Sequence, residues 1–153
     1  MGILIVDDDD DVRSIMELLI RNDGHRDVVT VESAEKLFSL LARSTEMHFD
    51  LIFLDVTMPN IDGIQSCREI RKDVRYRTVP IVMTTARVDM KTIEAAFDSG
   101  ATDYLTKPIK TPDLLACVRA KLKLKAELDM RDLLQSEFSS RFQQFGTLAE
   151  SLS

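Results

Sequence analysis

Acidic, hydroxyl and ammonium side chains follow short apolar runs at four places in the chain. These are Asp7 and Asp8 after the first run, Asp55 after the third, Thr85 at the end of the fourth and Lys107 after the fifth. Carboxylates that share a small space repel one another unless a cation joins them. Oxygen-only ligands suit a hard cation such as Mg²⁺, for which Mn²⁺ can substitute. Metal-binding acids, an acceptor carboxylate, a lysine and a hydroxyl form the set that phosphoryl transfer needs, because its catalysis consists mainly of positioning groups and neutralising negative charge.

The segment after Asp55 has features that would hold its carboxylate in place. Asp55 is followed by Val56-Thr57-Met58-Pro59, and the proline stiffens the turn because its ring fixes one backbone angle. Asp62-Gly63 then opens the next helix. We therefore expect the Asp55 carboxylate to stand on a rigid loop.

Five short apolar runs separate these residues and are typical of strands that are buried on both faces. The runs cover residues 3–6, 28–31, 51–54, 81–83 and 104–105. Segments with helical spacing lie between them, so strand and helix alternate five times. This alternation predicts an α/β fold, a doubly wound five-stranded parallel sheet in the flavodoxin-like order 2-1-3-4-5 with an extended C-terminal helix. In that topology ligands bind at the carboxyl ends of the strands, where the polar side chains would meet.

The C-terminal part of the chain has the pattern of one long helix. Thr111 is a suitable N-cap with Pro112 at the first helical position, and no further glycine or proline occurs before Gly146. We therefore divide the chain into a domain of residues 1–122 and a helical extension of residues 123–153.

The extension carries an apolar stripe, at spacings of three and four residues, that the domain cannot cover. The stripe consists of Leu134, Phe138, Phe142, Phe145, Leu148 and Leu152. It predicts a homodimer through a short parallel two-helix stalk, and it also suits a link to a C-terminal effector domain. The alternative is a frayed helix that ends at Lys125 with a disordered remainder, although the three phenylalanines make this segment unusually apolar for disorder.

Composition argues against several classes of function. A net charge of −6 and a pI near 4.9 argue against direct nucleic acid binding, which requires a clustered cationic surface. No apolar run approaches the roughly 20 residues of a membrane span, and no secretion signal is readable, so we expect no membrane association and a cytoplasmic location. Cys67 and Cys117 stand singly without metal-ligand spacing, so we expect two buried thiols.

Four motifs occur in order along the first 108 residues. They are Ile3-Leu-Ile-Val-Asp-Asp8, Leu51-Ile-Phe-Leu-Asp-Val-Thr-Met-Pro-Asn-Ile-Asp-Gly63, Thr85-Ala86 and Ser99-Gly-Ala-Thr-Asp-Tyr-Leu-Thr-Lys-Pro108. As a set they resemble the response regulator receiver domains of two-component signalling, in the CheY-like superfamily. The resemblance covers about residues 2 to 122.

The resemblance implies that Asp55 is the phosphoacceptor. It also implies that Asp8, Asp55 and the backbone carbonyl of Thr57 bind the metal ion. Asp7 would assist through a water molecule.

Four further residues acquire roles from the resemblance. Lys107 and Thr85 would contact the phosphoryl group, and a cis peptide bond would join Lys107 to Pro108. Thr85 and Tyr104 would form the switch that alters the surface of the fourth helix, fifth strand and fifth helix. A sensor histidine kinase or a phosphotransfer protein would donate the phosphoryl group, and hydrolysis would reset the state. Such a domain turns over no external substrate, so we do not expect a conventional enzyme.

Two other classes fit parts of the same pattern. A flavodoxin-like binding module would need a glycine- and hydroxyl-rich phosphate loop after the first strand, where this chain has aspartates from Asp7 to Asp11. A haloacid-dehalogenase-like phosphatase would carry a second aspartate two positions after its nucleophile, where this chain has Thr57. Turnover of a phosphomonoester would favour the phosphatase.

Overall fold

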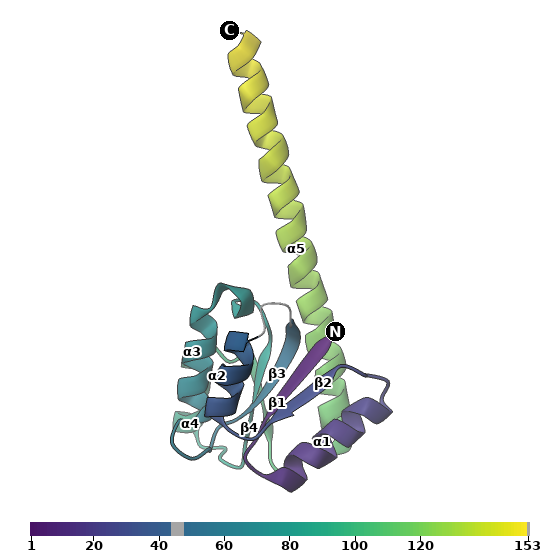
Figure 1. The fold of residues 1–153 in the computed structure, drawn as a ribbon, viewed down its shortest axis with the longest axis vertical. Helices are drawn as coiled ribbons and strands as arrows, with labels where there is room; N and C mark the ends of the chain where they lie inside the picture. The colour runs from purple at the N-terminus through teal and green to yellow at the C-terminus, as the bar shows by residue number, and fades with distance from the viewer. Residues whose placement is uncertain (44–47, 153) are drawn as a thin grey trace.

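The five apolar runs form one parallel sheet in the order β2-β1-β3-β4-β5, which confirms the predicted topology (Figure 1). The computed structural model describes residues 1–43 and 48–152, and the side chains between 48 and 147 in the second range. The strands are β1 Gly2–Val6, β2 Val28–Val31, β3 Phe49–Asp55, β4 Ile81–Thr85 and β5 Asp103–Thr106. The helices are α1 Asp10–Asn22, α2 Ala34–Arg43, α3 Gly63–Lys72, the 3-10 turn η1 Val74–Tyr76, α4 Met90–Asp98 and α5 Thr111–Leu152.

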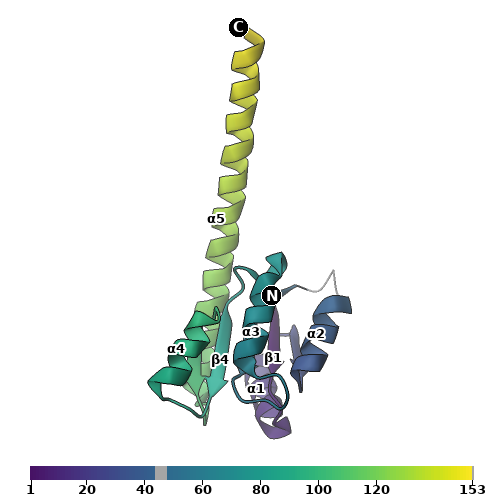
Figure 2. The same ribbon diagram turned by 90° about the vertical axis from the view of Figure 1, so that its left-hand side faces the viewer.

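Helices cover both faces of the sheet (Figures 1 and 2). α2, α3 and α4 pack on one face, where Leu4, Ile52 and Met83 point from the strands. α1 and α5 pack on the other, where Phe53 and Val82 point. Successive strand residues face opposite sides, so a strand that is covered twice must be apolar throughout. This is why β1, β3 and β4 were recognisable as unbroken apolar runs.

Side-chain caps fix where the helices begin, and two predicted caps were wrong. Because aspartate is a favoured cap and helical spacing begins near Val12, the sequence predicts Asp10 or Asp11 as the cap of α1. Asp9 is the cap instead, and it accepts hydrogen bonds from the backbone N–H groups of Asp11 and Val12. Asp9 is the last residue with an extended backbone, and that conformation is what lets a cap side chain fold back onto the first turn.

The second wrong cap is at α5. The Leu114 N–H donates to the Lys110 carbonyl, so Lys110 holds the cap position and Thr111 is already helical. Pro112 is therefore the second helical residue. The cap on α3 was predicted correctly, because Asp62 accepts from the Gln65 N–H at 2.8 Å.

α5 is much longer than the sheet that it covers (Figure 1). Its first turns bury Leu114, Val118 and Leu122 against the sheet. It then continues to Leu152, so the alternative of a helix ending at Lys125 is wrong. Every residue from 129 to 147 is exposed. The side chains of the predicted stripe at positions 148 and 152 lie outside the described residues.

The helices of the described chain include none that is long and apolar enough to cross a membrane.

Gly63 allows α3 to start directly against the end of β3. A Cβ atom at this position would lie 2.0 Å from the backbone oxygen of Asp55 and 2.9 Å from the Cα of Val56. The Gly63 N–H also donates to the Val56 carbonyl at 2.9 Å. Because Gly63 has no side chain, the first turn of α3 packs directly against the backbone that carries Asp55.

We predict that Gly63→Ala lowers the free energy of unfolding by about 1 to 3 kcal/mol, because backbone must move to admit the methyl group. Gly146→Ala is the matched control, since nothing lies within 4 Å of its Cβ position and alanine favours a helix. Urea unfolding at fixed protein concentration measures both. Equal midpoints for Gly63→Ala and the parent would contradict the close-approach argument.

Candidate functional site

The predicted site residues of three strands meet at the carboxyl edge of the sheet. Asp7 follows β1, Asp55 ends β3 and Lys107 follows β5. The Lys107 Nζ lies 2.9 Å from Oδ2 of Asp7 and 3.3 Å from Oδ1 of Asp55. The sequence predicted only that Asp7, Asp55 and Lys107 lie at the same edge of the sheet. The structure shows that Lys107 contacts both aspartates.

Three carboxylates gather around this ion pair. Asp7, Asp8 and Asp55 each offer an oxygen, and the three oxygens lie within 4.8 Å of one another. Asp7 and Asp55 are buried, whereas Asp8 is exposed, so the cluster opens to solvent on one side. A donor set made only of carboxylate oxygens fits a hard divalent cation such as Mg²⁺.

Asp7 is held more tightly than the sequence indicated. Its Oδ1 accepts a hydrogen bond from the Asp9 N–H at 2.9 Å, and its backbone carbonyl accepts one from Arg13 at 2.6 Å. Its Oδ2 faces the Lys107 ammonium but has no well-directed hydrogen bond within the described chain. A buried oxygen of this kind has capacity left for a water molecule or a cation.

Burial, and after it the neighbouring Asp7 carboxylate, raises the pKa of Asp55 from its usual value near 4 to about 7. The Lys107 ammonium and the Thr57 N–H, which lies 3.3 Å from Oδ1, oppose this change only in part. For Lys107 itself, burial lowers the pKa, but the Asp7 and Asp55 carboxylates outweigh burial and the net pKa is raised. One ammonium facing three carboxylates leaves the site short of positive charge.

Thr85 ends β4 as predicted, but its hydroxyl is engaged by its own loop. Oγ1 accepts from the Arg87 N–H at 2.9 Å and lies 3.2 Å from the Arg87 carbonyl. The residue paired with Asp55 across the strands is Thr84, whose carbonyl accepts from the Val56 N–H. The predicted contact of Thr85 with a phosphoryl group stays a prediction.

Tyr104 lies on β5 with its ring half-buried. It makes an edge-to-face contact with Phe97 of α4, with ring centroids 6.1 Å apart. The contact links the edge strand to the neighbouring helix. The switching role of Tyr104 and the metal-binding role of the Thr57 carbonyl also stay predictions.

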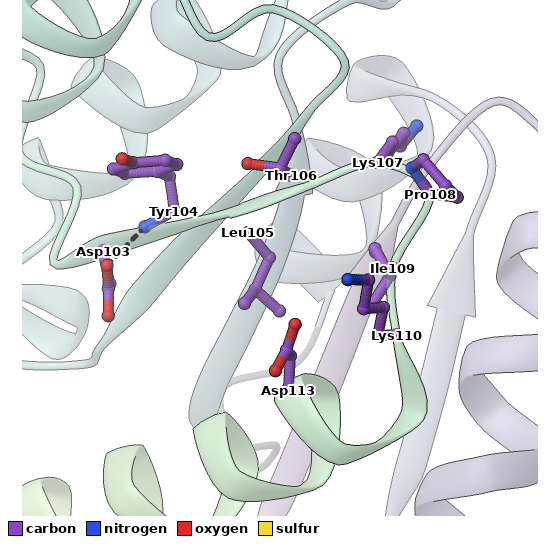
Figure 3. A pocket seen from close by; sticks show the side chains of 9 residues that line it. All are labelled: Asp103, Tyr104, Leu105, Thr106, Lys107, Pro108, Ile109, Lys110 and Asp113. Carbon is purple, nitrogen blue, oxygen red and sulfur yellow. Dashed lines mark hydrogen bonds between the residues drawn. The ribbon is translucent and has the colours of Figure 1, made fainter.

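A hollow of about 510 Å³ lies beside the acid cluster, along β5 and the turn that leads into α5 (Figure 3). Tyr104 and Thr106 point to one side of the strand and Leu105 to the other. Lys107 is on its wall, whereas none of the three clustered aspartates lines it. The Lys107-Pro108 peptide bond is cis, as the resemblance implied.

Sequence reasoning missed the parts played by Arg13 and Arg87. Arg13 binds the Asp7 carbonyl from the first turn of α1, and Arg87 occupies the Thr85 hydroxyl through its backbone. The contact of Arg13 could have been predicted, because Arg13 lies one turn into the helix that follows the acidic run. The second involves backbone atoms, which every residue type possesses, so the sequence carried no signal for it.

Comparisons with known proteins agree with this geometry. The response regulator receiver domain matches residues 3–119. The transcriptional regulatory protein AfsQ1 of Streptomyces coelicolor is 41% identical over 122 residues, which are 80% of this chain and 51% of that protein. The DNA-binding response regulator MtrA of Mycolicibacterium smegmatis is 36% identical over 121 residues, or 79% of this chain and 50% of that protein. The chain thus spans about half the length of these relatives.

A solved structure gives the same result. The crystal structure of the receiver domain of NtrX from Brucella abortus superposes with a TM-score of 0.70 at 27% identity, covering 80% of this chain and 98% of that one. The family match covers most of the chain, and the sheet order and the acidic edge of the sheet agree with it. The chain belongs to the response regulator receiver domain family of two-component signalling.

Proposed function

We propose that this receiver accepts a phosphoryl group on the carboxylate of Asp55. The observation that carries the proposal is the buried Asp55 carboxylate, with the Lys107 ammonium 3.3 Å away and two further aspartates beside it. The donor is a phosphohistidine of a sensor kinase or a phosphotransfer protein. An oxygen of Asp55 attacks the phosphorus, the bond from phosphorus to the donor nitrogen breaks, and the departing imidazole takes up a proton.

The residues of the chain divide the work of this transfer. Lys107 neutralises a phosphoryl oxygen once that oxygen draws it away from Asp7. Asp8, Asp55 and the Thr57 carbonyl would hold Mg²⁺, with Asp7 acting through water. The bound ion would supply the positive charge that the cluster lacks. The phosphoryl group stays on the chain until water attacks the phosphorus and restores the carboxylate, so there is no external turnover.

The state of Asp55 is read through Thr85 and Tyr104. The Thr85 hydroxyl must leave the backbone of Arg87 to reach a phosphoryl oxygen, which displaces the loop between β4 and α4. The Phe97 ring then loses part of its contact with Tyr104, so the surface of α4, β5 and α5 changes. This is a shift between two populated conformations.

The output lies beyond the receiver itself. We propose that residues 1–122 form the receiver and that the helix from 123 onward passes its state to an effector. AfsQ1 and MtrA carry transcriptional and DNA-binding descriptions, and this chain matches about half of each. The net charge of −6 argues that any DNA contact is made by an effector rather than by this chain.

We predict that Asp55→Asn abolishes base-labile phosphorylation by acetyl phosphate, because a carboxamide oxygen is too poor a nucleophile to form the acyl phosphate. Intact-mass spectrometry after incubation with acetyl phosphate and Mg²⁺ measures the adduct. Asp50→Asn, a change at the other end of β3, is the matched control and should label like the parent. Equal labelling of Asp55→Asn and the parent would remove Asp55 as the acceptor.

Asp55 should destabilise the metal-free protein above neutral pH. Its folded pKa of about 7 exceeds the value of about 4 in an unfolded chain, so stability is lost as the pH rises from about 4 through about 7. The stability advantage of Asp55→Asn over the parent should therefore grow by about 2 kcal/mol between pH 5 and pH 8 in the presence of a chelator.

Mg²⁺ at pH 8 should raise the melting temperature of the parent and leave Asp8→Ala unchanged, because the exposed carboxylate of Asp8 completes the oxygen set. Differential scanning fluorimetry across this pH range measures both effects. A stability difference between Asp55→Asn and the parent that does not vary with pH, or an equal Mg²⁺ effect on Asp8→Ala, would contradict the proposed site.

Thr85→Ala should bind beryllofluoride, a stable mimic of the phosphoryl group, but binding should not change the conformation of α4 and β5. We expect the amide resonances of α4 and β5 to move on ligand addition in the parent but not in this variant, with fluorine signals of bound ligand in both. Thr30→Ala on β2 is the control and should respond like the parent. A full response from Thr85→Ala would contradict the coupling.

A further inference from the structure

Arg13 lies in the first turn of α1, and its guanidinium group contacts the end of β1. Its Nη1 donates to the backbone carbonyl of Asp7 at 2.6 Å, and its Nη2 pairs with the Asp10 carboxylate. The Arg13 side chain is only 13% exposed, whereas that of Asp10 is 84% exposed. Asp7 is fully buried, so the contact with its carbonyl is the better shielded of the two.

The stability of α1 does not explain why an arginine occupies this position. A cation in the first turn of a helix is unfavourable, because the positive end of the helix dipole lies there. The ion pair with the exposed Asp10 contributes little, because solvent screens it. The contact of Arg13 with Asp7 is therefore the one that accounts for the residue.

The carbonyl that Arg13 binds belongs to the peptide unit that joins Asp7 to Asp8. A peptide unit is planar and rigid, so a hydrogen bond to its oxygen also fixes the direction in which the chain enters Asp8. The next unit, which joins Asp8 to Asp9, is held as well, because the Asp9 N–H donates to Oδ1 of Asp7 at 2.9 Å. Both peptide units that flank Asp8 are thus fixed, and Arg13 fixes one of them.

The position of Asp8 is unfavourable without such a restraint. Asp8 is exposed, and its carboxylate shares a space with those of Asp7 and Asp55, with oxygens within 4.8 Å of one another. Carboxylates at this distance repel one another, so an exposed aspartate on an unrestrained backbone would turn away from the two buried ones. A site whose ligands must first be drawn together binds its ion more weakly than one whose ligands are already in place.

We propose that Arg13 is a positioning residue of the metal site. Its hydrogen bond to the Asp7 carbonyl keeps the Asp8 carboxylate beside Asp55, so that a divalent cation meets the oxygen ligands already in place. This inference rests on the proposed function, since it takes Asp8 and Asp55 as ligands of Mg²⁺. Arg13 itself binds neither the ion nor the phosphoryl group.

Charge and positioning predict opposite effects of removing Arg13. The guanidinium is a cation at the acidic edge, so its loss would strengthen Mg²⁺ binding if charge alone acted. Its loss weakens Mg²⁺ binding if Arg13 acts by placing Asp8. The sign of the change in Mg²⁺ affinity therefore separates the two roles.

Titration of the full chain with Mg²⁺ alone, followed by the amide resonances of the loop after β3, tests the role of Arg13. We expect Arg13→Met to raise the dissociation constant about tenfold, as removal of a residue that orients a metal ligand does. Arg13→Gln, which is too short to reach the carbonyl, should do the same, and it replaces Arg13→Met if that variant does not fold. Arg13→Lys should bind more tightly than either, because an ammonium can still donate to the Asp7 carbonyl.

Arg21→Met is the matched control. Arg21 lies in the last turn of α1 and also donates to a loop carbonyl, that of Arg26, at 2.6 Å. Its loss removes the same charge and the same kind of hydrogen bond at the far end of the helix. It should leave the dissociation constant unchanged, and the amide resonances of α3 show that each variant remains folded.

Three results would overturn the positioning role. The first is Mg²⁺ binding by Arg13→Met that equals or exceeds that of the parent. The second is an equal weakening by Arg21→Met, which would trace the effect to the stability of α1. The third is an Arg13→Lys that binds as weakly as Arg13→Met.

Asp8→Ala distinguishes a failure of this inference from a failure of the proposed function. If Asp8→Ala binds Mg²⁺ as tightly as the parent, the metal assignment fails, and the role of Arg13 fails with it. If Asp8→Ala loses Mg²⁺ binding while Arg13→Met keeps it, the metal assignment stands and only the role of Arg13 is wrong.

Discussion

The burial of Asp7 and Asp55 side by side, with one ammonium between them, is the interaction on which the rest of the receiver depends. Their exposures are 0% and 3%, and Lys107 is 2.9 Å from one and 3.3 Å from the other. β5 is separated from β3 by β4, so the lysine side chain must reach across the end of β4. Its backbone is held for this purpose by the N–H bond to the Thr85 carbonyl at 2.8 Å. A single cation cannot satisfy three carboxylates, and this imbalance favours the binding of a second cation, as the proposed function requires.

The apolar core of the fold compensates for the unfavourable burial of these carboxylates. Two extended apolar clusters sandwich the sheet and stabilise the chain enough to tolerate unfavourable charge at one edge. Gly63 and Asp62 place the first turn of α3 against the backbone of Asp55, so this backbone cannot move to carry the carboxylate out to solvent. The unfavourable burial of the Asp55 carboxylate, which raises its pKa, is therefore retained at the site.

The sequence predicted the sheet and the meeting of the acids because both follow from simple periodicities. An unbroken apolar run such as 51–54 has one structural meaning in a chain that alternates strand and helix, and strand order then brings Asp7, Asp55 and Lys107 to one edge. The predicted cap of α1 was wrong because neighbouring residues such as Asp9 and Asp10 share the same capping chemistry, and only the backbone angles choose between them. At α5 the helix begins one residue earlier than predicted, so the favoured cap residue Thr111 lies inside the first turn and Lys110 holds the cap position. The hydrogen bonds of the Thr85 hydroxyl to the backbone of Arg87 could not be predicted, because every residue type has these backbone atoms. The pKa of Asp55 could not be predicted either, because it depends on the extent of burial, and an apolar strand pattern does not specify how deeply the last residue is buried.

A short connection joins Lys107 at the acidic edge of the sheet to the long helix α5. Three residues separate Lys107 from the start of α5 at Thr111 (Figure 3), and the helix is then fastened to the receiver by ion pairs of Arg119 with Asp23 and of Lys121 with Asp103. Lys125 adds an ion pair with Asp50 at 3.8 Å, and beyond it about 27 residues continue as one rod of roughly 40 Å, at about 1.5 Å per residue. A tilt of about 5° at the anchors moves the far end of such a rod by about 4 Å. Asp103 begins the strand that Lys107 follows, so β5 connects the acidic edge of the sheet to one anchor of α5. A rearrangement that tilts α5 at its anchors would therefore be enlarged along the helix without any change in the helix itself.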